Sequence, residues 1–244
     1  MNAKWLPALL ALTLSACGGG GTSAPPAPAP VATATPQGLW NGTTSSSNKV
    51  GLAVLGNGDT WAIYTSNNAI VGALHGTTTY SGTALSGTGS EFNIASKTIT
   101  AVSYTGSFSP KGSINLTTSS GTGISGSYDA SFDQPASLNA LSGTFVGSSV
   151  TGTTPAQAAI MGITPHGLVN TIGVGCNASG TVEPSSTGLN IFDFKLTFNG
   201  TSCALGNIAS VSGIAYYDAP NRTVLMMALN SALSDGYIYV GVKP

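Results

Sequence analysis

Few side chains in this 244-residue sequence could carry acid–base or nucleophilic chemistry. Its two histidines are His75, in GALHGTTTY, and His166, in ITPHGLV, and histidine is the commonest general base in hydrolysis. We expect His75 in a strand and His166 in a turn. The glutamates, Glu91 and Glu183, are both surrounded by turn-forming residues, so a paired-carboxylate glycosidase site would arise only through folding. No G-x-S-x-G motif occurs; although the many serines leave a triad open, we predict no catalytic residues and no enzyme activity.

One segment matches a nucleotide-binding motif in sequence but not in its predicted structural context. Residues 121–126, GTGISG, match G-x-G-x-x-G, a motif that holds phosphate at the start of a following helix. The residues that follow, SYDASF, alternate as a strand does, so we reject the match. H-E-x-x-H, EF-hand and zinc-ligand spacings are also missing from the sequence, and we therefore predict no metal and no cofactor.

The amino terminus has the features of an export signal. Lys4 supplies a positive charge, and residues 5–14 form an apolar run. That run is short beside the roughly 20 residues that a helix needs to span a bilayer, and it suits the hydrophobic part of a signal peptide. Small residues follow at once, in the segment LSAC that ends at Cys17.

The segment LSAC resembles the lipobox of bacterial lipoproteins, in which the signal is cut before a cysteine whose sulfur carries diacylglycerol. The resemblance implies a signal peptide over residues 1–16, lipidation of Cys17 with three acyl chains including palmitate, and a membrane anchor. In this family Asp after the cysteine favours the inner membrane; Gly18 here implies the outer membrane, on its cell-surface or periplasmic face. The alternative is an ordinary secreted protein in which Cys17 is incidental.

The assignment of Cys17 to lipid also predicts the role of the two other cysteines. With Cys17 given to lipid, Cys176 and Cys203 remain as one pair in an exported protein, and exported proteins form disulfides. A metal-binding or nucleophilic cysteine would need partners, but there is no C-x-x-C and no histidine close by in the sequence. We therefore predict a disulfide between Cys176 and Cys203.

Charge is scarce along the chain. Seven Lys and Arg residues and eight Asp and Glu residues give a formal net charge of −1, without any basic run, so no electrostatic footprint for nucleic acid is present. Residues 17–37 contain the lipidated cysteine and then a Gly-, Pro- and Ala-rich stretch, for which we predict a disordered, flexible linker. We expect Asp129 and Asp133, at a strand end and a connection, to be solvated.

From Gly38 onward, period-two alternation predicts strands and no amphipathic helix. In NIFDFKLTFNG, residues 190–200, three phenylalanines and a leucine share one face, and Asn199-Gly200 predicts a tight hairpin turn. The second half then has eight candidate strands, at 142–150, 157–163, 168–174, 179–183, 189–198, 201–216 (bent or split), 223–230 and 236–242.

The first half repeats this pattern, which predicts an all-β protein built as two tandem small antiparallel β-barrels or sandwiches of about eight strands each. We place an N-terminal β domain at 38–134 and a C-terminal β-barrel domain, with the disulfide, at 139–244. A single larger sandwich is the rival arrangement. The tyrosines and tryptophans of these strands are core by default, or could line a cavity; they are Trp40, Trp61, Tyr216, Tyr217, Tyr237 and Tyr239.

Two small β units behind a lipobox and a linker are similar in architecture to the surface lipoproteins typified by transferrin-binding protein B and factor H-binding protein. This likeness transfers no binding residue, so the ligand-binding residues stay unassigned. We expect a non-enzymatic outer-membrane lipoprotein that acts as a tethered binding or envelope module, with the membrane as one partner, a protein or small ligand as another, and no nucleic acid. The alternative is an inhibitor or immunity lipoprotein that blocks an enzyme, a toxin or a phage.

An integral outer-membrane barrel is disfavoured because the strands are short and broken by glycine.

Overall fold

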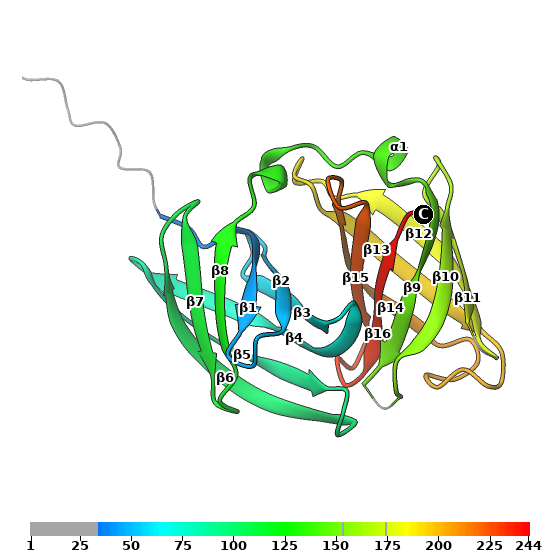
Figure 1. The fold of residues 1–244 in the computed structure, drawn as a ribbon, viewed down its shortest axis with the longest axis horizontal. Coiled ribbons are helices and arrows are strands. Elements are labelled where there is room, and N and C mark those ends of the chain that lie inside the picture. The colour runs from blue at the N-terminus through cyan, green and yellow to red at the C-terminus, as the bar shows by residue number, and fades with distance from the viewer. Residues whose placement is uncertain (1–33, 153, 174) are drawn as a thin grey trace, which may run out of the picture. The chain divides into compact units, whose positions relative to one another are not determined.

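The protein folds into two closed antiparallel β-barrels, each formed by eight consecutive strands (Figure 1). The structure, a computed structural model, describes residues 34–152, 154–173 and 175–244. The predicted all-β fold of two eight-stranded units is confirmed, and the single larger sandwich is wrong, because β1 pairs with β8 and β9 pairs with β16 to close each sheet on itself. The predicted signal peptide, Cys17 and residues 17–33 of the predicted linker lie outside the described residues.

The first barrel is an up-and-down ring in which each strand pairs with its neighbours in sequence. Its strands are β1 (Gly38–Thr44), β2 (Lys49–Val54), β3 (Asp59–Ser66), β4 (Ala69–Ser81), β5 (Ala84–Asn93), β6 (Thr98–Phe108), β7 (Ser113–Thr118) and β8 (Gly123–Tyr128). The segment GTGISG thus leads into strand β8 and not a helix, as the rejection of a nucleotide-binding motif requires. Two single turns, η1 (Ala130–Asp133) and α1 (Leu138–Leu141), connect this barrel to the next.

The second barrel has the same topology. Its strands are β9 (Gly143–Thr151), β10 (Gln157–Ile163), β11 (Leu168–Gly173), β12 (Asn177–Pro184), β13 (Phe192–Asn199), β14 (Ser210–Asp218), β15 (Thr223–Leu229) and β16 (Gly236–Val242). Seven of these fall close to the predicted ranges.

The strand predicted at 201–216 is wrong in its first part, because β14 begins only at Ser210. Residues 200–209 form a loop in place of the tight hairpin that Asn199-Gly200 predicted. Cys203 lies in this loop and bonds to Cys176 with an S–S distance of 2.04 Å, so the predicted disulfide is present. The loop is also held by its own hydrogen bonds, including Gly200 N–H to Asn207 Oδ1 at 3.0 Å. These tertiary constraints override the local turn signal.

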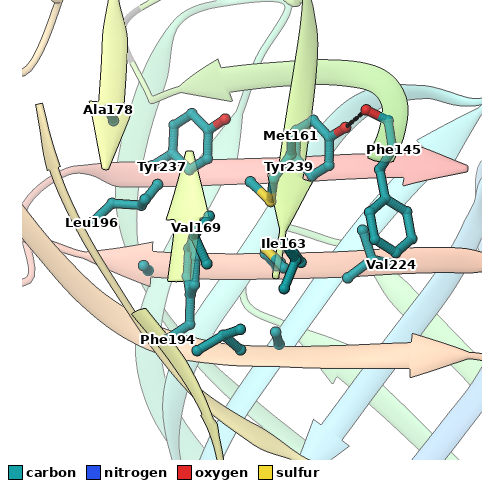
Figure 2. Close-up of a cluster of buried hydrophobic side chains, with 14 of the residues drawn as sticks. Phe145, Met161, Ile163, Val169, Ala178, Phe194, Leu196, Val224, Tyr237 and Tyr239 are labelled. Atoms are coloured by element: carbon teal, nitrogen blue, oxygen red, sulfur yellow. Dashed lines mark hydrogen bonds between the residues drawn. The ribbon is translucent and has the colours of Figure 1, made fainter. Parts of the chain in front are cut away.

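Side chains fill the lumen of each barrel, as alternation along closed strands requires. In the first barrel the lumen residues include Trp40, Leu52, Leu74 and Tyr104. Gly87 makes room for the Tyr104 ring, because a Cβ at Gly87 would lie 2.3 Å from the ring carbon Cζ. In the second barrel Figure 2 shows the lumen cluster, where the Tyr239 hydroxyl donates to the Phe145 carbonyl at 3.0 Å.

A third apolar cluster lies on the outer faces of strands from both barrels. Strands β3, β15 and β16 are buried on both faces, because their outward side chains pack in this cluster. We call it the seam cluster; its large members include Leu39, Trp61, Ile63, Phe92, Tyr216, Met227 and Ile238. Of the aromatic residues singled out in the sequence, Trp61 and Tyr216 belong to the seam cluster, and the other four lie in the lumens. The expectation that they are core residues is therefore confirmed.

Candidate functional site

One end of the first barrel has an open cavity of about 370 Å³. It lies where β1, β3, β5 and β7 end, and we call it the barrel mouth; its lining includes Thr44, Asn48, Tyr64, Glu91, Thr100 and Ser120. Glu91 points into the lumen, because it pairs directly with Leu74, a residue of the lumen core, and paired side chains share a face. The mouth therefore offers hydroxyls, amides and a single carboxylate. Its volume falls within the roughly 300–1,000 Å³ of typical ligand pockets.

The carboxylate of Glu91 has little internal compensation. Its Oε2 accepts a short hydrogen bond from the Ser120 hydroxyl. In residues 34–152, 154–173 and 175–244, this is the one side-chain hydrogen bond that Glu91 makes, and neither the His75–Asp59 contact nor the Lys111–Asp133 ion pair involves it. The side chain is only partly buried. Glu91 thus presents a negative charge and acceptor capacity to anything that enters the mouth.

Tyr64 supplies a second unsatisfied group. Its hydroxyl is buried and has no hydrogen-bond partner, whereas Tyr104, another lumen tyrosine of this barrel, hydrogen-bonds the Thr78 hydroxyl at 3.0 Å. Burial raises the pKa of Tyr64, and the nearby Glu91 and Tyr104 raise it further, so the phenol stays neutral. A buried hydroxyl left unpaired costs free energy, typically about 1–3 kcal/mol. Tyr64 is therefore a group that a ligand could satisfy.

The chain enters the first barrel at the opposite end. Trp40 Nε1 donates to the Pro36 carbonyl at 3.1 Å, and Ala34 packs against the lumen core there. Strand β1 then runs from Gly38 to Thr44, which lines the mouth. The mouth consequently faces away from the point at which residues 34–37 join the barrel.

In the second barrel, side chains fill the lumen closer to the rim than they do at the mouth of the first barrel. A cavity of about 130 Å³ remains beside the disulfide, lined by residues that include Thr171, Cys176 and Tyr237. Burial raises the pKa of Tyr237 to about 12, although hydrogen bonds to Ser149 and Thr171 oppose this shift. The space is well below the roughly 300 Å³ of small ligand pockets, so this rim is a weaker candidate than the barrel mouth.

His75 lies on strand β4, as predicted, in a polar cluster on the outer face of the first barrel. Its Nε2 is 2.9 Å from Asp59 Oδ1, and Trp61 Nε1 donates to Asp59 Oδ2 at 2.7 Å. The His75 and Trp61 rings also contact each other, with centroids 4.2 Å apart. Ser90 is the direct cross-strand neighbour of His75, but no side-chain hydrogen bond joins these two described residues. Because Asp59 binds both rings, the cluster reads as a side-chain brace and not as an assembled triad.

Of the remaining predicted candidates, Glu183 lines a cavity of about 700 Å³ together with His75 and Asp59, whereas His166 is not among its described lining residues. His166 lies in the turn between β10 and β11, as predicted. Glu183 lies on β12 in the second barrel, opposite Asp193, so the chain does not pair it with Glu91 of the first barrel. Among the described residues no group of three or more His, Cys, Asp and Glu side chains could hold a metal ion. Nor does this part of the chain contain a helix of the length and apolarity that crossing a membrane requires.

Asp129 is not the solvated residue that its position predicted. Its carboxylate accepts from the Tyr216 hydroxyl at 2.7 Å, from Asn41 Nδ2 at 2.8 Å and from the Ser131 amide at 2.9 Å. Partial burial raises the pKa of Asp129, but these hydrogen bonds outweigh burial and hold the pKa below its usual value. Asp133 is exposed, as expected, and pairs with Lys111 at 2.8 Å. Asp129 therefore ties β1 of the first barrel to β14 of the second.

The sequence contains one signal for the mouth, in the residues of β5. Along β5, Leu85 and Glu91 fall on the same side at period two, with glycines between them, so a carboxylate interrupts an inward face. Tyr64 carries no such signal, because a lumen tyrosine with a partner and one without look alike in sequence. Comparison of the chain with models of protein families, with curated proteins and with solved structures finds no match.

Proposed function

We propose that this protein is a non-enzymatic, lipid-anchored outer-membrane protein that binds a small ligand in the barrel mouth. The observation that carries the binding role is the mouth itself, a ligand-sized cavity with an uncompensated carboxylate and an unpartnered hydroxyl at Glu91 and Tyr64. The lipobox-like segment that ends at Cys17 supports the anchor. The two barrels, similar in architecture to those of surface lipoproteins, support a tethered binding module.

The direction of the mouth supports the same proposal. The chain enters the first barrel at the end where Pro36 contacts Trp40, and the mouth lies at the other end. A tether over residues 17–37 would therefore join the first barrel at the end opposite the mouth. Extended Pro-rich chain rises about 3 Å per residue, so such a tether would hold the barrels up to tens of ångströms from the lipid.

A non-enzymatic role is supported by the places of the chemical side chains. His75 is braced by Asp59 and Trp61, and His166 lies in a turn of the other barrel. The carboxylate of the mouth, Glu91, bonds a serine hydroxyl and is joined there by no histidine or second carboxylate among the lining residues. This is chemistry suited to holding a ligand.

The anchor is tested by Cys17→Ala in the native bacterial host. We expect the protein to move from the membrane fraction to the soluble periplasmic fraction, because stable attachment needs more than one acyl chain and the variant can carry none on sulfur. Ser23→Ala, which changes the same segment but keeps the cysteine, is the matched control and should stay with the membrane. An unchanged distribution of Cys17→Ala would contradict the proposed anchor.

A further inference from the structure

We infer that the ligand of the barrel mouth carries a protonated amino group, with Glu91 as its charge partner and Tyr64 as a second acceptor. This inference rests on the proposed function of the mouth as a binding site, and adds the chemical class of the ligand. It follows from the charge of the mouth, from the groups left unsatisfied there and from the lack of an exposed aromatic ring.

Charge gives the first step. Among the described residues that line the mouth, Glu91 is the one carboxylate, and none is a Lys or Arg. An anionic ligand would meet repulsion from Glu91, with no Lys or Arg in the described lining to oppose it. A neutral ligand would leave the charge of Glu91 unpaired while displacing the water that solvates it, which is unfavourable. An ammonium group replaces that water with a charge-assisted hydrogen bond, roughly twice as strong as a neutral one.

Hydrogen-bonding capacity gives the second step. An ammonium group has three donors and no acceptor. Glu91 has acceptor capacity beyond its bond from Ser120, and the neutral Tyr64 hydroxyl can accept as well as donate. The hydroxyls of Thr44 and Thr100 line the same cavity and can accept a third bond. The mouth therefore offers acceptors of different types in the number that an ammonium group needs.

Two other ligand classes fit less well. Sugars are commonly held on the exposed face of an aromatic ring, but Tyr64 is 5% exposed and the other aromatic residue of the lining, Phe92, is 1% exposed. A calcium ion takes six to eight oxygen ligands and prefers several carboxylates, whereas the mouth has one. Neither class uses the single unpaired charge as fully as an amine does.

Isothermal titration calorimetry of the full-length protein in detergent at pH 7 tests the inference with matched probes. The probes are propylammonium, putrescine and glucosamine, each compared with its neutral counterpart: 1-propanol, 1,4-butanediol or glucose. We expect at least one ammonium probe to bind saturably at one site, and about tenfold or more tighter than its counterpart, the difference typical of a hydrogen bond to a charged group.

Variants of the mouth locate the binding. Glu91→Gln keeps the shape and removes the charge, so it should weaken the ammonium probe about tenfold or more, and Tyr64→Phe about threefold. Glu183→Gln makes the same chemical change in the second barrel and should leave affinity unchanged. Thr100→Trp fills the mouth and should abolish binding of every probe. The melting temperature of each variant without probe shows that it folds.

Five results would contradict the inference in whole or in part, and they separate it from the proposed function. If neutral and ammonium probes bind equally and Thr100→Trp abolishes their binding, the mouth is a binding site but its ligand does not need a protonated amino group. If ammonium binding survives Glu91→Gln, Glu91 is not the charge partner. If the affinity is unchanged in Tyr64→Phe, Tyr64 is not the second acceptor. Binding that survives Thr100→Trp, or no saturable binding by any probe, overturns the inference and the mouth as the binding site together.

Discussion

Removal of the Cys176–Cys203 disulfide should destabilise the second barrel by about 3.5 kcal/mol. The bridge closes a loop with a sequence separation of 27, which runs through β12 and β13. In the chain-entropy description, closing a loop of that length costs the unfolded chain about 12 cal/mol/K, or about 3.5 kcal/mol at 25 °C. Breaking the bridge returns that entropy to the unfolded state.

The perturbation is best made as the double variant Cys176→Ala/Cys203→Ala. Cys203 is buried against the lumen core, and a serine there would add the cost of burying a hydroxyl. Equilibrium unfolding in urea, followed by far-ultraviolet circular dichroism, gives the change in the free energy of unfolding. Reduction of the unmodified protein with dithiothreitol is the matched control, because it opens the same loop without changing any residue.

A second probe reports whether the two barrels unfold together. The described tryptophans, Trp40 and Trp61, both belong to the first barrel, in its lumen and in the seam cluster. If the seam cluster couples the barrels, tryptophan fluorescence should shift to lower urea with the circular dichroism; independent barrels would leave the fluorescence transition in place. A loss of stability below about 1 kcal/mol in both the double variant and the reduced protein would refute the loop-entropy reasoning.

Two further predictions concern the first barrel and its tie to the second. Asp129→Asn should lower the free energy of unfolding by about 1 kcal/mol at pH 7, a hydrogen bond to a charged group discounted for partial exposure. Because folding lowers the pKa of Asp129, its contribution to stability is present above the unfolded pKa of about 3.9 and is lost as the pH falls through the folded pKa. The free energies of unfolding of the variant and the unmodified protein, measured in urea, should therefore converge below about pH 4. A difference between them that widens there would contradict this sign. Gly87→Ala should destabilise the first barrel by about 1–3 kcal/mol in thermal unfolding, because its Cβ would lie 2.3 Å from the Tyr104 ring and 2.5 Å from the Thr77 carbonyl. Gly162→Ala, whose Cβ would meet nothing closer than 4.0 Å, is the control, and equal losses at the two glycines would count against the steric explanation.

Much of the fold was predictable because closed barrels impose a local rule. Each strand must alternate between lumen and exterior, and this period-two pattern is visible residue by residue. The last strand was placed at residues 236–242, where β16 lies. The loop at 200–209 was not predictable in the same way. Its shape depends on Cys176, which is far away in sequence, and the local Asn-Gly signal carries no information about that partner.

The contact between the barrels left a signal of a different kind. Segments VLMMAL of β15 and GYIYVGV of β16 are apolar without alternation, as strands buried on both faces are. Such a run predicts that a second layer covers the strand, although it does not say which layer. The role of Asp129 could not be seen at all, because its partners Asn41 and Tyr216 are 88 and 87 residues away. Local patterns thus predict strands, and only tertiary structure assigns polar partners.

The two barrels share a topology but differ in how their lumens end, and this difference argues for a division of roles. In the first barrel the Tyr104 ring lies over Gly87 and bonds Thr78 in the interior, which leaves the mouth around Glu91 with about 370 Å³ of space. In the second barrel Tyr237 lies at the rim cavity, where about 130 Å³ remains, and the disulfide fixes the adjacent loop. A rim that is filled and cross-linked favours rigidity over ligand entry. We therefore expect the second barrel to act as the scaffold that holds the seam cluster, and the first barrel to carry the ligand. On this division, loss of the disulfide should lower stability without changing the affinity of the mouth for an ammonium probe at temperatures where the protein stays folded.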